Sequence, residues 1–468
     1  ILTMADKFYA KGPGNNGYIK NLEVLSFCGW DNKSAAFQMQ LYKTAEGKYY
    51  IYGSGFGGIK GASVVIAEVT DPENPRFVNR MFACDPDEYP TTTISKVQVA
   101  EDKLICAMTA GSGPDALVDQ GDGKPVKSLT GIYIYSLKED PENPKFLGYW
   151  DCGVPNSIGV HRFMYNGGPY CYLSCEAERF EGMIMRIVDI SDPANPKEVG
   201  NWWSPEQFVG GYPGRTVDHS APHVPSFMDK GWMHGPPFRR DDGIMVCGYC
   251  GDGLYVLDTT DVTRPKCLGN LKFMPAFSSH LAGARTHTAL PLPGRDLVVV
   301  TNEGERFQFF PKGSIKEAQA MNNLHMVDIS DPTKPTLVAE FPYPEVPEDF
   351  PYPNFNVMNL ECQGPFGPHN LHEPMSNKPW LEQRGDLVYC CYFAAGLRIF
   401  DVSDQYYIKE LAYFIPPNPN KTNEESFFPG LPGPRNAMTE DCCVDDRGYI
   451  YVTCFDDGFY ILKKTIDM

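Results

Sequence analysis

The chain has 468 residues, of which 42% are hydrophobic and 21% charged, and its formal net charge is −18. This acidic balance excludes the basic surface that nucleic-acid binding needs, and no stretch reaches the roughly 18 uninterrupted apolar residues of a membrane helix. The 44 glycines and 41 prolines exceed the usual combined share of about 12% and indicate a turn-rich, all-β protein.

One strand–turn–strand unit recurs along the sequence. Residues 187–202 show it in full: a β-branched strand, the turn Asp192-Pro-Ala-Asn-Pro196, and a second strand ending at Trp202. The Asp that opens the turn returns at intervals of roughly 50 to 70 residues, which suits a four-stranded propeller blade with its loops. Its six positions are Asp71, Asp140, Asp192, Asp261, Asp331 and Asp404.

The two ends of the chain complement each other. A seventh copy of the first strand, at 458–462, is followed by the chain end, and the missing partner strand is found near the N-terminus, at about residues 22–30. We therefore predict a seven-bladed β-propeller, a single domain over residues 1–468, whose last blade is completed by the N-terminal strand. Such a clasp removes the open edge that a ring of sheets would otherwise expose.

The cysteines indicate a reducing compartment. There are 15, an odd number, and they include the neighbours Cys390-Cys391 and Cys442-Cys443. Neighbours in a strand point to opposite faces, so we expect no disulfide framework and a cytoplasmic location. The opening residues lack the apolar core of a secretory signal peptide. Long insertions rich in Pro, Phe and Gly, which can form lids or mediate oligomerisation, are expected at 204–243, 304–322 and 343–366.

The repeated unit, a strand followed by Asp-x-Ser-Asp-Pro-x-x-Pro, resembles that of the LVIVD-repeat β-propellers. The resemblance extends from Leu22 to Leu462. It implies the fold and leaves the function open, because that family is largely uncharacterised and a fold does not fix a function. At the level of the fold, the chain is also similar to selenium-binding proteins, carotenoid oxygenases and oligogalacturonate lyases. That similarity implies histidines near the propeller axis that hold a metal ion.

Histidines gather where the innermost strands of four consecutive blades are expected to begin. Imidazoles around one axis suit Fe, Mn, Zn or Cu, so the expected cofactor is a divalent transition metal. The alternative is a polar channel in which the histidines bind only water. The candidate ligands, one per blade, are His161, His219, His287 and His372. The remaining histidines are interpreted as substitutes or supporting groups (His223, His369), as structural (His325) and as exposed or locally satisfied (His234, His280).

Carboxylates and arginines accompany these histidines. Glu176 and Glu303 end second strands that run back to the same face, and together with His369 they are candidates for acid–base catalysis. Four arginines near the starts of inner strands predict binding of a small anionic or oxygen-rich molecule, although they could equally pair with buried carboxylates. They are Arg162, Arg215, Arg285 and Arg435.

Three functions fit these residues. The first is a metal-dependent lyase or hydrolase acting on a small, oxygen-rich and anionic substrate. The second is an Fe or Cu oxygenase or oxidase. The third is a non-catalytic scaffold that binds a partner across its face and holds no stoichiometric metal. Histidines confined to four neighbouring blades favour an off-centre metal with open coordination positions, and therefore the two enzymes. No nucleic-acid or membrane partner is expected.

Overall fold

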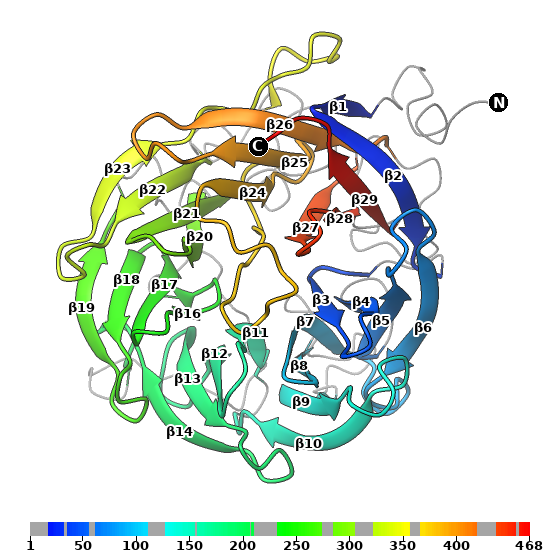
Figure 1. Cartoon of the computed structure of the whole chain (residues 1–468). Helices are drawn as coiled ribbons and strands as arrows, with labels where there is room; N and C mark the ends of the chain where they lie inside the picture. Colours follow the sequence, from blue (N-terminus) through cyan, green and yellow to red (C-terminus); the bar gives the residue numbers. More distant parts are fainter. Residues whose placement is uncertain are drawn as a thin grey trace, which may run out of the picture.

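The structure is a computed structural model that describes residues 17–31, 35–55, 61–110, 127–154, 157–205, 207–209, 232–273, 284–304, 322–355, 366–418, 437–454 and 458–468. Within these ranges the strands form seven antiparallel sheets around a central axis (Figure 1). The same ranges contain no helix, and hence none that is long and apolar enough to cross a membrane. The predicted seven-bladed β-propeller is confirmed.

Blades one to three are regular four-stranded meanders, each with its first strand nearest the axis. Blade one contains β3 (Met39–Lys43), β4 (Tyr49–Ser54), β5 (Ser63–Glu68) and β6 (Arg76–Phe82). Blade two contains β7 (Thr92–Ala100), β8 (Lys103–Ala110), β9 (Gly131–Ser136) and β10 (Lys145–Asp151). Blade three contains β11 (Val160–Met164), β12 (Tyr170–Glu176), β13 (Met183–Asp189) and β14 (Lys197–Trp202).

Blade four differs from its neighbours because its inner strand is split. The two halves, β15 (Trp232–Met233) and β16 (Phe238–Arg239), both pair with β17 (Ile244–Cys250). The sheet continues with β18 (Gly253–Asp258) and β19 (Lys266–Leu271). Blade five is regular again and contains β20 (Ala284–Pro291), β21 (Leu297–Gly304), β22 (Leu324–Asp328) and β23 (Thr336–Glu340).

The N-terminal segment adds a strand to each of the last two blades. Blade six contains β24 (Leu387–Cys391), β25 (Leu397–Asp401), β26 (Lys409–Ile415) and, at its outer edge, β1 (Tyr18–Lys20). Blade seven contains β27 (Thr439–Val444), β28 (Ile450–Cys454), β29 (Gly458–Lys464) and, as its outer strand, β2 (Leu22–Gly29). The pairing of β2 with β29 confirms that an N-terminal strand closes the last blade.

Residues 366–372 take the innermost place in blade six without forming a regular strand. Isolated bridges join Phe366 to Phe393 and Leu371 to Cys390. Between them, the backbone N–H of His369 donates to the Cys391 carbonyl at 2.8 Å. This inner segment therefore brings its polar side chains to the axis at the position that an inner strand has in the other blades.

The repeated turn sets the packing between blades. Asp192 accepts backbone N–H groups from two and three residues further on, which fixes the turn. The outer strand of the preceding blade approaches this turn so closely that a Cβ on Gly148 would lie 1.8 Å from the Pro193 carbonyl oxygen. In β2, Ser26 makes the corresponding contact, donating its hydroxyl to the Pro72 carbonyl at 2.5 Å. The ring therefore closes through the same kind of contact that joins its other blades.

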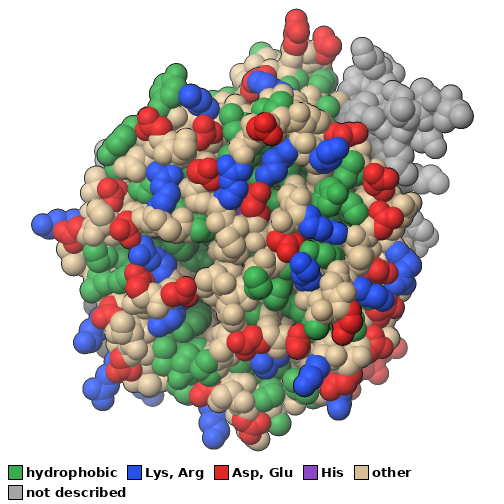
Figure 2. Space-filling model, in the orientation of Figure 1, with side chains coloured by type: hydrophobic (Ala, Val, Ile, Leu, Met, Phe, Trp, Pro, Cys, Tyr) green, Lys and Arg blue, Asp and Glu red, His purple; other side chains and the backbone are tan. Residues whose placement is uncertain are grey.

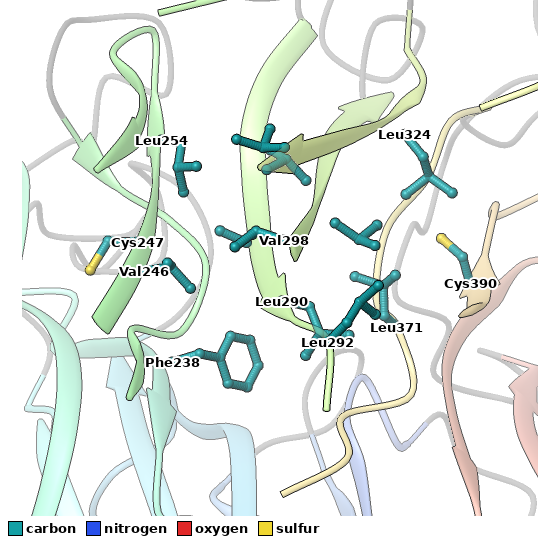
Figure 3. Close-up of a cluster of buried hydrophobic side chains, with 14 of the residues drawn as sticks. Phe238, Val246, Cys247, Leu254, Leu290, Leu292, Val298, Leu324, Leu371 and Cys390 are labelled. Atoms are coloured by element: carbon teal, nitrogen blue, oxygen red, sulfur yellow. The ribbon is translucent and has the colours of Figure 1, made fainter. Parts of the chain in front are cut away.

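Apolar side chains fill the spaces between neighbouring blades. Figure 3 shows one such cluster, in which Val246 of β17, Leu290 of β20 and Val298 of β21 contribute to the core between blades four and five, and Leu371 joins from the inner segment of blade six. The described cysteines form no disulfide among themselves. Packing of the sheets, with no covalent cross-links in these ranges, therefore holds the described blades together.

A segment that the sequence did not single out closes one end of the channel. Residues 373–386, here called the strap, leave the inner segment of blade six and cross the axis before β24 begins (Figure 1). Figure 2 shows that the described side chains over this face carry charges of both signs, and no histidine is visible among them. The strap's hydrogen-bond partners lie in each of the other six blades: Leu41, Glu101, Asn166, Asp241, Arg295 and Val444.

Candidate metal centre

The inner strands of blades three, five and seven each carry a β-bulge at the same height. Each bulge sets two consecutive residues opposite one partner, so both residues of the pair can face the axis, where a regular strand would turn one of them away. The first residues of the pairs belong to an upper layer and the second residues to a lower layer. The pairs are His161–Arg162, His287–Thr288 and Glu440–Asp441.

Four imidazole rings lie side by side in the upper layer, one from each of blades three to six. The ring centroids are 4.5 Å apart for His161 and His234, 4.1 Å for His234 and His287, and 4.7 Å for His287 and His369. His234 lies in the break between β15 and β16, where its backbone N–H donates to the Gly248 carbonyl. Three of the rings are buried, and His161 is partly exposed.

The side chain of Glu303, near the end of β21, lies at the centre of this row. Its Oε2 is 3.3 Å from His234 Nε2 and 3.8 Å from His287 Nε2, and its Oε1 is 3.6 Å from His369 Nε2. Ligand atoms of His234, His287 and Glu303 all lie within 4.8 Å of one another. Three blades therefore present nitrogen and oxygen donors to one small, buried volume.

The His287 and His369 imidazoles are held in their neutral form. Burial is the main cause that lowers the pKa of His287 and of His369 well below 6.5. The second nitrogen of each ring is also engaged: His287 Nδ1 lies 2.6 Å from Thr288 Oγ1, and His369 Nδ1 lies 3.0 Å from the Glu440 carbonyl oxygen. A neutral ring with one nitrogen fixed and the other facing Glu303 has the form in which histidine binds metals.

Glu176 and Arg162, two further candidates from the sequence, are held by neighbouring groups. Glu176 ends β12 and accepts the backbone N–H of Ile158 through Oε2 at 3.1 Å. Arg162 lies in the lower layer, where Nη1 donates to Thr288 and Asn370 at 3.2 and 2.5 Å.

Arg162 also forms a buried ion pair. Its Nη2 lies 3.0 Å from Glu373 Oε1, and the two side chains are 1% and 5% exposed. Breaking such a buried pair typically costs about 3–5 kcal/mol. Of the two roles expected for the arginines, Arg162 thus shows the pairing with a buried carboxylate.

His372 lies outside the cluster, although the sequence placed it among the four ligands. Its Nε2 is 2.9 Å from the Glu382 carbonyl oxygen, and its Nδ1 accepts the Val444 N–H at 3.2 Å. Both ring nitrogens are thus engaged by backbone groups between blades six and seven. His369, which the sequence suggested as a substitute, takes the place in the row. Four other predicted residues lie outside the described part of the chain: Arg215, His219, His223 and Arg435. The backbone of Arg285 belongs to β20, but its side chain is outside the described part.

His234 is the residue that the sequence interpretation missed, since it was assigned to exposed or locally satisfied loop. It is 3% exposed and central to the row. A signal for it existed: His234 precedes Ile244, the start of β17, by the same number of residues as His287 precedes Leu297, the start of β21. Aligning the histidines to the second strands would therefore have selected His234 for blade four in place of His219.

Two cavities, of about 500 and 690 Å³, lie on the opposite face, beside the strap. Basic side chains on their walls already have partners: Arg240 binds Asp242 at 2.7 Å and Asp296 at 2.8 Å, and Arg239 donates to Thr259 at 3.1 Å. The charge of Arg240 is therefore compensated within the protein, and Arg239 is held by a neutral hydroxyl group. The convergence of chemically active groups is at the histidine row, and the candidate site is placed there.

Comparison with known proteins agrees with the repeat and the fold. The family model described as "LVIVD repeat" matches residues 183–203 and 318–342, and no curated protein matches the chain. The β-propeller domain of Cps50 (Swd1) from Myceliophteria thermophila is 10% identical over 93% of this chain and 100% of that chain, with a TM-score of 0.49.

A second similar structure is the periplasmic gluconolactonase PpgL of Pseudomonas aeruginosa. It is also 10% identical, over 87% of this chain and 95% of that chain, with a TM-score of 0.48. At this identity and with TM-scores below 0.5, neither likeness bears on what this chain does. The chain is thus a seven-bladed β-propeller in which two segments match the LVIVD repeat.

Proposed function

We propose that the chain is a metal-dependent enzyme of the lyase or hydrolase type that acts on a small, oxygen-rich anion. The observation that carries this proposal is the buried group formed by His234, His287 and Glu303, whose ligand atoms lie within 4.8 Å of one another. Metal–ligand bonds of about 2.0–2.2 Å from nitrogen and oxygen atoms fit inside such a group. His161 and His369 flank it and extend the set to four imidazoles.

The donor atoms present suit the metals expected from the sequence. Imidazole nitrogens with a carboxylate oxygen favour Fe(II), Mn, Zn or Cu, whereas Mg²⁺ and Ca²⁺ prefer all-oxygen sites. The burial that keeps His287 and His369 neutral supports the same assignment, because only neutral imidazole is a ligand. A metal ion held there would act as a Lewis acid on a carbonyl or carboxylate oxygen of the substrate.

The residues of this chain would position the ligands and move the proton. Glu440 and Thr288 hold the rings of His369 and His287 through the nitrogens that face away from Glu303. Glu303 lies within reach of three rings, so it can serve either as a further ligand or as the general base. Arg285 and Arg435 stay proposed contacts for the anionic end of the substrate.

An Fe or Cu oxygenase or oxidase is the second candidate, favoured by the number of imidazoles. Four imidazole nitrogen donors suit a redox-active Fe or Cu ion as well as they suit a Lewis-acid site. Metal identity and oxygen uptake separate the two enzymes, since only the oxygenase or oxidase needs Fe or Cu and consumes oxygen. If the chain holds no stoichiometric metal, the non-catalytic scaffold is the function that remains.

Elemental analysis of purified protein tests the proposal. Untagged wild type grown with Fe, Mn, Zn and Cu should hold about one metal ion per chain. Removing a ligand in His234→Ala or His287→Ala should lower metal affinity by more than the roughly 10–100-fold that loss of a supporting partner causes. His325→Ala is the matched control, because His325 binds Glu340 at 2.8 Å away from the row, and it should keep its metal. Wild type without metal would overturn the proposal.

A further inference from the structure

Lys96 is a buried amine that the metal site does not use. It lies on β7, the inner strand of blade two, directly after the extra residue of a fourth bulge, Ser95. The alignment of the bulges places it in the lower layer, beside Arg162 of the next blade. Its side chain is 1% exposed. Lysine is among the residues least often fully buried, and it is then usually paired.

The Lys96 amine makes no hydrogen bond to the described residues. Nζ lies 3.4 Å from the centroid of the Phe37 ring, and no described residue accepts a hydrogen bond from it. Phe37 also contacts His369, with ring centroids 5.7 Å apart. The amine is therefore one aromatic ring away from the imidazole row. An unsatisfied buried polar group is rare in proteins and calls for an explanation.

The charges near Lys96 favour a neutral, nucleophilic amine. Burial is the main cause that lowers the pKa of Lys96 well below 10.5, and the Arg162 guanidinium lowers it further, against the smaller opposing effects of Glu440, Asp441 and Glu303. Desolvation and a neighbouring cation are the two conditions that activate lysine amines for attack on carbonyl groups.

A second lysine at the channel axis provides an internal comparison. Lys378 of the strap is also fully buried, but its Nζ donates to Gln40 Oε1 at 2.9 Å and to Gln98 Oε1 at 2.6 Å. Lys378 therefore has the acceptors that Lys96 lacks. Burial alone cannot explain why one lysine is satisfied and the other faces only an aromatic ring, and the difference marks Lys96 as the reactive one.

We propose that the Lys96 amine captures the carbonyl group of a small aldehyde or 2-oxo acid as an imine. The amine nitrogen bonds to the carbonyl carbon, its two protons leave with the carbonyl oxygen as water, and a C=N bond remains. The face of Phe37 forms an apolar wall beside the bound carbon, and the partly exposed His161 marks the side from which a small molecule reaches the row. This capture goes beyond the proposed metal chemistry and needs no metal.

Reductive trapping tests the proposal within one protein. Wild type is incubated at about pH 6.5 with glyoxylate and cyanoborohydride, which delivers hydride to the imine carbon, and carboxymethylated lysines are mapped by peptide mass spectrometry. Ordinary lysines are almost fully protonated at this pH, so Lys96 should be modified at least about ten times faster than any surface lysine. It should also be modified faster than Lys378, whose amine is held by Gln40 and Gln98. Modification of surface lysines without Lys96 would overturn the proposal.

The same reaction on chelator-treated protein separates this proposal from the metal site. Capture at Lys96 should persist there, so a chain without metal would refute the proposed function and leave the capture standing. Lys96→Met should lose the fast adduct while Lys378→Met keeps it. Loss of the fast adduct in Lys378→Met with retention in Lys96→Met would assign the reaction to the strap and contradict the inference.

Discussion

Neighbouring residues on one inner strand serve different purposes in this propeller. His161 joins the imidazole row, while Arg162 binds Glu373 in the layer below. An ordinary strand would send the second residue of each pair into the space between blades. The bulges keep both at the axis, so that a ring of potential ligands lies directly upon a ring of buried polar groups. The geometry of the site thus depends on backbone irregularities as much as on side-chain identity.

These irregularities explain what the sequence could predict of the site. His161 and His287 can be placed at the axis from the sequence because each lies where the innermost strand of its blade is expected to begin. His369 and His372 could not be separated, since residues 366–372 form no regular strand and no apolar alternation marks their register. His234 was assigned to a loop because the strands on either side of it contain two residues each, too few for a pattern.

At the scale of single residues, we expect this site to retain its metal to a lower pH than a site made of exposed histidines would. Protonation competes with the metal only below the folded-state pKa, and burial places the pKa of His287 and His369 well below 6.5. Metal loss, followed by equilibrium dialysis from about pH 7.5 downwards, should therefore begin clearly below about pH 6.5. Circular dichroism at each pH controls for unfolding. Half of the metal lost above that pH would contradict the expectation.

Among the elements, the strap does most to make the ring one unit. It carries Glu373, which pairs with Arg162 of blade three, and Lys378, which binds the amides of Gln40 in blade one and Gln98 in blade two. Blades in such a ring contact mainly their neighbours. The strap adds contacts across the axis between the site and distant blades. The sequence did not reveal it, since residues 373–386 lack both a repeat and a regular hydrophobic period.

Lys378 gives the strap a measurable pH dependence. Burial lowers its pKa in the folded protein from 10.5 to about 7. Between these values the unfolded chain binds a proton that the folded chain does not, so the contribution of Lys378 to stability rises with pH, by at most about 1.4 kcal/mol per unit. Below about pH 7 both states are protonated and this slope disappears.

Urea unfolding of wild type and Lys378→Met from about pH 6 to 9 checks this sign. The free energy of unfolding of wild type minus that of the variant should be flat at the acid end and rise above about pH 7. The variant also loses the two hydrogen bonds to Gln40 and Gln98. That loss shifts the difference in unfolding free energy by the same amount at every pH and does not change its slope. Two curves that stay parallel across the range would show that Lys378 remains charged in the fold.

For the whole molecule, one contact repeated around the ring explains why the fold was predictable. The turns of blades three, four and five receive the outer strand of the preceding blade at a glycine. A Cβ on Gly148 would lie 1.8 Å from the Pro193 carbonyl oxygen, one on Gly200 2.0 Å from that of Val262, and one on Gly269 2.5 Å from that of Pro332. The Asp-Pro-x-x-Pro turn and the strand glycine are both visible in sequence, so blade number and order could be read from them. The bulges and the strap occur inside single copies and left no repeated signal.

Closure of the ring leads to a graded prediction about the N-terminal strands. β2 covers the edge of β29 over eight residues, and Trp30, which is fully buried, follows it and contacts Phe459 at 4.8 Å between ring centroids. β1 adds three half-buried residues to blade six. A chain beginning at residue 32 should therefore lose far more stability than one beginning at Leu22.

The magnitude can be bounded from Trp30 alone. Removing a buried tryptophan side chain costs about 3–5 kcal/mol, and the exposed edge of β29 adds a tendency to associate. Three chains, beginning at residues 17, 22 and 32, should be compared by thermal unfolding and by light scattering. The chain beginning at 17 is the control, because it keeps both strands. The chain beginning at 22 should melt a few degrees lower than this control. The chain beginning at 32 should melt far lower and aggregate. Equal melting of the first and the last would show that the ring closes without β2 and would remove the clasp from the account of this fold.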